Sequence, residues 1–123
     1  MTVNPVPHIL NTLRTEQATS PALIWYGPDS ERVELSGKVL DNWAAKTSNY
    51  LAEELDAEPG TTVELDLPVH WKTLVWALGA WQAGCPIALS AAAGAPVRAT
   101  AADPEPRTPG ELVAAVALPA LAM

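Results

Sequence analysis

The chain has 123 residues, a length that suits one domain with a real core, and 49% of its residues are hydrophobic. Its formal net charge is −7, from 14 acidic and 7 basic residues, and the basic residues form no cluster. Because nucleic acids and anionic lipids are bound through Lys and Arg clusters, we expect neither as a partner. The acidity is interpreted as a device for solubility.

Targeting signals are missing from the sequence. No run of 18 residues is wholly apolar, and the N-terminus lacks a basic patch followed by a long apolar stretch. The sequence therefore predicts neither a transmembrane helix nor a secretory signal. With the single cysteine, Cys85, no intrachain disulfide can form, so a cytoplasmic location is expected.

The first expected element is a helix over residues 5–16, within an N-terminal segment of residues 1–21. Asn4 is predicted as its N-cap, with Pro5 at the first helical position. Its apolar residues recur at the spacing of one helix face: Val6, Ile9, Leu10 and Leu13.

A β-hairpin is expected next. Residues 22–27 (ALIWYG) are apolar and aromatic, and residues 32–35 (RVEL) alternate between polar and apolar. Residues 28–31 (PDSE) between them have turn chemistry. This pattern predicts a hairpin with one solvent-facing side.

Ser36 is predicted to cap a helix that runs from about residue 38 to residue 55 and ends before Pro59-Gly60. Asp41 is expected to lie mostly off its apolar face. That face is formed by Val39, Leu40, Trp43, Ala44, Thr47, Tyr50 and Leu51.

A βαβ unit follows. Residues 61–67 alternate, with Val63, Leu65 and Leu67 on one side. The next helix, of about 14 residues and closed by Gly84, is apolar nearly all round, which is typical of a helix covered on more than one side. Residues 85–90 (CPIALS) are predicted as a buried strand, parallel to the first.

After Ser90 the chain is rich in Ala, Pro and Gly and is expected to be mostly loop. Residues 96–101 are a possible short strand, and residues 113–118 are predicted as a last strand. We therefore expect one α/β domain over residues 1–123, with its core in residues 22–90 and an Ala/Pro-rich segment over residues 91–123. The sheet is expected to be small, parallel or mixed.

Short motifs within this core agree with a known pattern. Residues 35–40 read LSGKVL, residues 55–63 read LDAEPGTTV, and a strand ending LDLP precedes a helix ending WALGAWQAG. In this order and spacing, residues 22–89 resemble the N-terminal part of the acyl-adenylate-forming superfamily, which contains acyl-CoA synthetases, peptide-synthetase adenylation domains and luciferase. The chain, including its tail ELVAAVALPALAM, is most similar to a group of actinobacterial proteins that resemble this N-terminal region.

The departures from that family concern catalysis. The family's Ser/Thr/Gly-rich ATP loop, which ends in Pro-Lys-Gly, has no counterpart, and no Lys occurs after Lys72. Gly37 stands where the pattern prefers Tyr, and Val39 where it prefers Glu. No catalytic residue of the family can be carried over, so we expect no enzyme activity, no catalytic or metal-binding residue and no cofactor.

Other chemistry has little support. Cys85 is interpreted as a small buried thiol, because a nucleophilic Cys needs a base nearby and His8 and His70 are distant in sequence. His70 is expected to be solvated or hydrogen-bonded locally, and Ser36 has its capping role. The remaining candidates are carboxylates in turns and at a helix end, interpreted as solvated charge: Asp29, Glu31, Glu53, Glu54 and Glu58.

Five tryptophans and no phenylalanine are unusual in so small a chain. Core packing is expected for Trp25, Trp43 and Trp81. Trp71 and Trp76 point to different sides of one helix, so at least one is expected near a surface that becomes covered. Trp71 and Trp76 are the candidate interface residues.

The function expected from these features is that of a non-catalytic interaction module, most simply a homodimer. The alternatives are a small-molecule protein that keeps an acyl or adenylate pocket, and a truncated piece of an acyl-CoA synthetase-like enzyme.

Overall fold

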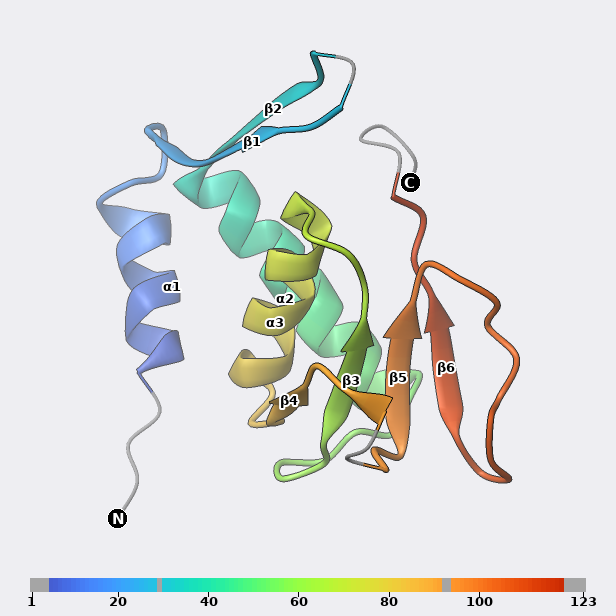
Figure 1. The fold of residues 1–123 in the computed structure, drawn as a ribbon. Helices are drawn as coiled ribbons and strands as arrows, with labels where there is room; N and C mark the ends of the chain where they lie inside the picture. The colour runs from blue at the N-terminus through green and yellow to red at the C-terminus, as the bar shows by residue number, and fades with distance from the viewer. Residues whose placement is uncertain (1–4, 29, 92–93, 119–123) are drawn as a thin grey trace.

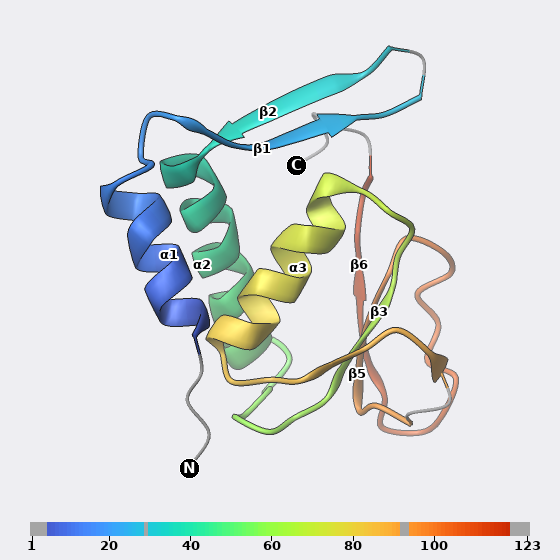
Figure 2. The ribbon, with the colours of Figure 1, turned by 60° about the vertical axis from the view of Figure 1, so that its left-hand side comes forward.

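The computed structural model describes residues 5–28, 30–91 and 94–118. Within them, α3 packs on one face of a four-stranded parallel sheet, α2 packs on α3, and α1 lies on the outer side of α2 (Figures 1 and 2). The strand order is β4-β3-β5-β6. The elements are α1 (Val6–Thr15), β1 (Pro21–Tyr26), β2 (Arg32–Ser36), α2 (Gly37–Glu53), β3 (Val63–Asp66), α3 (Trp71–Gln82), β4 (Ile87–Ala88), β5 (Val97–Thr100) and β6 (Leu112–Ala115).

The N-terminal hairpin is confirmed. Strands β1 and β2 pair antiparallel and cross the ends of the helices (Figure 2). One side, with Leu23, Trp25 and Val33, packs against the helices, while Ile24 and Tyr26 are exposed. The hairpin therefore has the predicted solvent-facing side.

Helix α2 starts as predicted, because the Ser36 hydroxyl accepts a hydrogen bond from the Val39 amide at 3.2 Å. The expected placement of Asp41 off the packed face is wrong: this carboxylate is buried and pairs with Arg14 of α1 at 3.1 Å. An ion pair with the neighbouring helix offsets the cost of burying the charge. The predicted cap of α1, Asn4, lies outside the described residues.

The surroundings of Gly37 explain why a glycine stands where the family pattern prefers Tyr. A Cβ atom at this position would collide with the carbonyl oxygens of Leu13 and Gln17, which belong to α1 and the segment after it. The Gly37 amide donates to Gln17 and Ser20 carbonyl oxygens. The end of α1 therefore occupies the space that a tyrosine side chain would need.

Helix α3 is covered on two sides, as its composition predicted. Trp71, Val75 and Leu78 pack into one core with α1, α2 and the hairpin. Ala77 and Ala80 pack into a second core with the sheet. Leu78 belongs to the first core, whereas Trp81 packs against both.

The βαβ unit is also confirmed, since β3 and β4 are parallel and flank α3 in sequence. Val63 and Leu65 are buried on the helix side, and Leu67 packs against the same core. Strand β4, however, has only two residues and is half-buried. It lies at one end of the sheet, where a single neighbouring strand supplies all its backbone partners.

The segment after residue 90 contributes more to the sheet and to the hydrophobic core than the sequence indicated. Strand β5 is buried along its whole length and lies between β3 and β6, and both pairings are parallel. The last strand predicted over residues 113–118 exists as β6, but it begins at Leu112 and ends at Ala115. The core therefore extends beyond residue 90, because Val97, Ala99 and Ala114 complete the sheet side of it.

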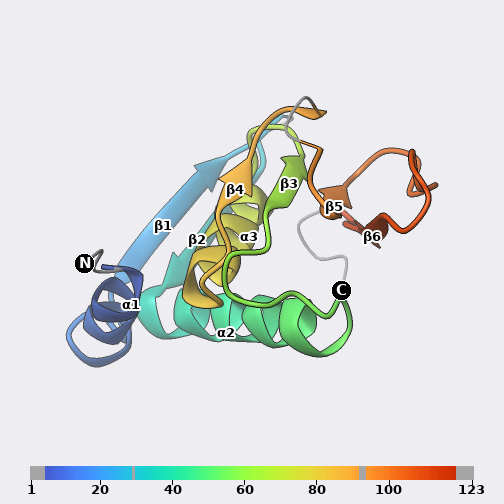
Figure 3. The ribbon, with the colours of Figure 1, turned by 90° about the horizontal axis from the view of Figure 1, so that it is seen from below.

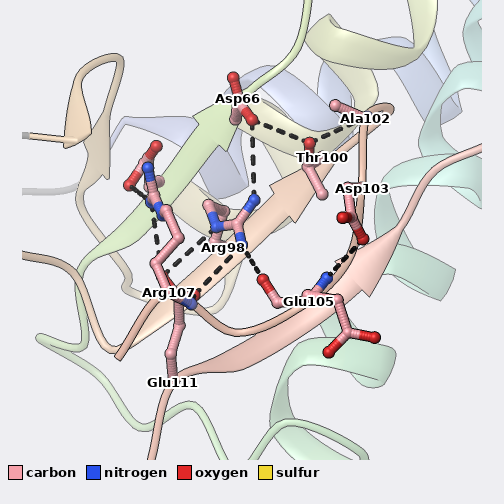
Figure 4. Close-up of polar contacts among 9 residues, drawn as sticks. Asp66, Arg98, Thr100, Ala102, Asp103, Glu105, Arg107 and Glu111 are labelled. Carbon is pink, nitrogen blue, oxygen red and sulfur yellow. Dashed lines mark hydrogen bonds and ion pairs between the residues drawn. The ribbon is translucent and has the colours of Figure 1, made fainter. Parts of the chain in front are cut away.

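The face of the sheet away from the helices carries charge instead of apolar residues (Figure 4). Glu64 of β3, Arg98 of β5 and Glu111 before β6 are each less than a tenth exposed. Arg98 donates twice to Glu111, at 3.2 and 3.3 Å, and approaches Asp66 at 3.7 Å. Arg107, half-exposed, bridges Glu64 and Glu111. We call these five residues the ion cluster.

The ion cluster holds the pKa of the Glu111 carboxyl down, from 4.5 to about 2. The largest cause is hydrogen bonding from the Arg98 side chain, followed by the backbone amide of Arg107. A carboxyl with a lowered folded-state pKa stabilises the protein above its unfolded pKa. That contribution is lost as the pH falls from about 4.5 to about 2.

Leu65→Asp should remove the folded state or lower the free energy of unfolding by more than about 4 kcal/mol, because it places an unpaired carboxylate in the sheet core. Chemical denaturation of the purified variant measures the loss. Leu89→Asp, at a position that is 76% exposed, is the matched control and should unfold like the wild type. Wild-type unfolding of Leu65→Asp would contradict the placement of β3.

Glu111→Gln should reduce the acid sensitivity of folding. The free energy of unfolding from urea titrations should fall less between neutral pH and pH about 2 in this variant than in the wild type, since one carboxyl with a lowered pKa is gone. Glu53→Gln, at the exposed end of α2, should keep the wild-type difference. An equal loss in Glu111→Gln and the wild type would be the contrary result.

Candidate functional site

An apolar groove runs between α2, α3 and the end of β6. It consists of two adjoining hollows of about 200 and 290 Å³, which share part of their lining. Within the described residues the groove contains no acidic side chain. Its lining residues are Trp43, Lys46, Thr47, Tyr50, Lys72, Val75, Trp76 and Ala114–Ala117.

Aromatic contacts shape the groove. The ring of Trp76 meets Tyr50 edge-on, with centroids 6.1 Å apart, and Trp43 meets Trp71 in the same way at 5.2 Å. Such edge-to-face pairs are a favoured packing geometry that fixes ring orientation. The rings therefore present a preformed apolar wall along α2 and α3.

The two candidate interface residues differ in accessibility. Trp71 is 3% exposed and lies in the core under the hairpin, so its surface is already covered within one chain. Trp76 is half-buried and lines both hollows. Of the two, Trp76 is the one with surface to offer, and its participation in an interface stays a prediction.

The Lys72 side chain has an unusual environment. It is 5% exposed, its Nζ donates to the Ala117 carbonyl oxygen at 2.6 Å, and it lies 5.4 Å from the Trp71 ring centre. Burial lowers the pKa of this amine. Among the described residues it is the single charged group in the smaller hollow, whose walls are otherwise mostly apolar.

His70 is the N-cap of α3, and its Nδ1 accepts a hydrogen bond from the Lys72 amide at 3.1 Å. Its ring lies 5.1 Å from that of Trp25, whose Nε1 donates to Glu31 at 2.8 Å. Burial lowers the pKa of His70, although Glu31 opposes the shift. The local hydrogen bond expected for this histidine is confirmed.

Cys85 is buried, and its thiol lies 3.5 Å from the Glu58 carbonyl oxygen. Burial raises the pKa of the thiol, which favours the unreactive protonated form. The structural interpretation of Cys85 is therefore supported. Glu53, Glu54 and Glu58 are exposed, as expected for solvated charge, and Asp29 lies outside the described residues.

The described part of the chain lacks the features of a metal centre and of a membrane span. No group of three or more His, Cys, Asp or Glu side chains there could hold a metal ion. None of the helices in that part combines the length and apolar character needed to cross a membrane.

Sequence reasoning missed the groove and the ion cluster. Lys72 was not singled out, since a lysine in the first turn of a helix is normally solvated. The alternation of residues 61–67 gave no role to Glu64 or Asp66, and Arg98 lay in a segment expected to be mostly loop. One signal was available in the sequence: the residues directly before and after Glu64, and those directly before and after Arg98, are all apolar.

Comparison with known proteins places these features in context. No family model matches the chain. A "TIGR03089 family protein" of Mycobacterium tuberculosis is 40% identical over 77 residues, which are 62% of this chain and 32% of the relative. The chain thus spans about a third of the length of this curated relative.

Solved structures share the fold over most of the chain. An acyl-CoA synthetase from Brucella canis is 24% identical with a TM-score of 0.66, and the match covers 80% of this chain and 20% of that one. The N-terminal subdomain of NpsA from Klebsiella oxytoca gives 15% identity and a TM-score of 0.70 over 92% of this chain and 32% of that one. The same subdomain in complex with 3-hydroxybenzoyl-AMSN gives 0.71 at 15% identity, over 92% and 30% of the two chains.

These findings confirm the resemblance derived from the sequence motifs. The chain has the fold of the N-terminal subdomain of acyl-CoA synthetases and peptide-synthetase adenylation enzymes.

Proposed function

We propose that this chain is a non-catalytic assembly module built on the N-terminal part of the adenylate-forming fold, and that two copies associate through β6 and the adjoining groove. The observation that carries the proposal is that the end strand β6 lies directly beside the apolar groove, which is lined with aromatic side chains.

Strand β6 is an end strand among the described residues. The Leu112 amide donates to the residue just before β5, and the Val116 amide donates to the last residue of β5. By the alternation of a strand, the Val113 and Ala115 backbone groups therefore point away from β5. Leu112 is 41% exposed. Unpaired strand edges are templates for pairing with another chain.

The groove suits side chains from a second copy. Each hollow is smaller than the roughly 300–1,000 Å³ usual for a site that encloses a drug-sized ligand. Half-buried aromatic residues such as Trp76 and Tyr50 are enriched at protein interfaces. The lining also carries Lys46 and Lys72 and no carboxylate in a chain of net charge −7, which reduces repulsion between two copies at this place.

The non-catalytic part of the proposal rests on the sequence. A phosphate-binding loop rich in Ser, Thr and Gly, followed by Pro-Lys-Gly, supplies backbone amides to nucleotides in the resembled family, and this chain has no such run. The match covers only 20% of the Brucella canis protein and 32% of the Klebsiella oxytoca subdomain, both under 25% identical, so the comparison supports a shared fold and no shared activity.

A second candidate function is the binding of a small aryl or acyl carboxylate in the groove. The observation that favours it is the buried Lys72 ammonium in an apolar hollow. The NpsA subdomain forms a complex with 3-hydroxybenzoyl-AMSN, an aryl ligand. Trp43 and Trp76 line the groove, so their fluorescence would report such a ligand.

The purified chain should catalyse no ATP–pyrophosphate exchange with any fatty or aryl acid, because the family's ATP loop has no counterpart and no Lys occurs after Lys72. The measurement compares radiolabel exchange with a protein-free blank. Exchange above this blank that co-purifies with the chain through two chromatographic steps would contradict the non-catalytic role.

Sedimentation equilibrium at micromolar concentration should give twice the chain mass of 13.0 kDa. Val113→Pro removes an outward N–H, so it should restore the monomer, and the matched control Val113→Ala should remain a dimer. Trp76→Ala should weaken association as well. Near-ultraviolet circular dichroism verifies that each variant is folded.

A wild-type chain that is monomeric at micromolar concentration would rule out the dimer proposal. The binding candidate is then decided by titration with benzoate and with benzamide: quenching of tryptophan fluorescence by benzoate alone, lost in Lys72→Met, would support it. If the chain is monomeric and neither compound quenches the fluorescence, both the dimer proposal and the binding candidate are ruled out.

A further inference from the structure

The connection between β5 and β6, residues 101–110, is an irregular segment that lies outside the packed body. It projects from the edge of the sheet in the view along the strands (Figure 3). All ten residues are exposed, and none belongs to either hydrophobic core. Pro104, Pro106 and Pro109 supply no amide for backbone pairing. We call this segment the strap.

Polar contacts fasten the strap to the sheet (Figure 4). The Arg107 side chain bonds Glu64 at 2.5 Å and Glu111 at 3.4 Å, and its backbone amide donates to Glu111 at 2.9 Å. Arg98 donates to the Glu105 carbonyl oxygen at 2.8 Å. At the start of the strap the Ala102 amide donates to the Thr100 hydroxyl at 3.0 Å.

We propose that the strap releases from the sheet as a unit when the contact of Arg107 with Glu64 and Glu111 is screened or removed, while the helices and the sheet remain folded. This inference is independent of the proposed assembly role. It concerns a conformational device that ionic strength controls.

The strap and the body are held by different forces. Apolar burial, which salt does not screen, holds α2, α3 and the sheet together. Arg107 is 42% exposed, so its ion pairs are open to screening by salt. Segments with few apolar contacts open locally at a lower free energy than the whole domain.

The charges left behind remain balanced when the strap opens. Arg98 loses its hydrogen bond to the Glu105 carbonyl oxygen but keeps its two hydrogen bonds to Glu111 and its approach to Asp66, none of which involves a strap residue. Glu64 loses Arg107 but becomes accessible to water. Release therefore leaves no charge buried without a partner, which is the usual reason why a broken ion pair is costly.

Opening also enlarges a recess beside the strap. A hollow of about 310 Å³ lies there, with Arg107 and Thr108 of the strap in its wall and Glu64 and Glu111 on the sheet side. Its remaining lining residues are Ala91, Gly94 and Ala95. Among the described residues Arg107 pairs with Glu64 of β3 and with Glu111, and Glu111 also pairs with Arg98 of β5, which approaches Asp66.

Amide hydrogen exchange, read residue by residue by NMR on the full chain, tests the inference. The reporters in and next to the strap are the hydrogen-bonded amides of Ala102, Glu105, Arg107 and Glu111. Between about 0.01 and about 1 M salt the Debye length falls from about 30 to about 3 Å. These amides should exchange about twofold to fivefold faster at high salt, while α2 amides keep their relative rates.

Variants separate this cause from a general effect of salt. Arg107→Met keeps the apolar stem but removes the charge, so at low salt it should already show the fast exchange and respond little to added salt. Arg32→Met removes a similarly exposed arginine that pairs with Glu34 on the hairpin, and it should leave strap exchange unchanged.

Two results would overturn the inference. Strap exchange that depends neither on salt nor on Arg107→Met would show that the ion pairs do not hold the strap. Strap and α2 amides that accelerate together in Arg107→Met would show that the strap opens only with the whole domain.

Discussion

The burial of α3 on two sides is the constraint on which the rest of the structure depends. One side of the helix completes the core with α1, α2 and the hairpin, and the other completes the core with the sheet. Gly79 allows the close approach on the α2 side, because a Cβ there would meet Thr47. Two small cores joined by one helix give a short chain more buried apolar surface than either could supply alone. Loss of α3 packing would therefore affect the hairpin and the sheet together.

The second face of the sheet follows a different principle. Open parallel sheets are normally covered by helices on both faces, but here ion pairs and an exposed loop close the face opposite α3. Such an arrangement costs desolvation energy, and the Arg98–Glu111 pair offsets it only through its two hydrogen bonds. The result is a body with one apolar side that is firmly packed and one polar side whose order depends on charge. Any device controlled by ionic strength belongs on the second side.

The groove arises where these two sides meet. Among the described residues β6 is an end strand of the sheet, and the aromatic residues of α2 and α3 form a wall that β6 covers only in part. Lys72 draws the chain after β6 toward α3 through its bond to Ala117. The groove and the outer position of β6 among the described strands thus have one origin, the place of the last strand in the sheet. This is why we propose association at this place rather than elsewhere on the surface.

The sequence by itself determined the order and type of most elements, the hairpin with one exposed side, the βαβ unit and the family resemblance, because periodicity, caps and turn residues act over a few neighbours. It did not reveal that Asp41 is buried, that Val97–Thr100 is a central strand, or that Trp71 is covered while Trp76 lines a groove. Those outcomes depend on partners distant in sequence, such as Arg14 for Asp41. A charged residue in a short strand can lie at a solvent-exposed edge of a sheet, or it can lie in a buried ion pair. Only the tertiary structure decided between them, because it brings the opposite charge within reach.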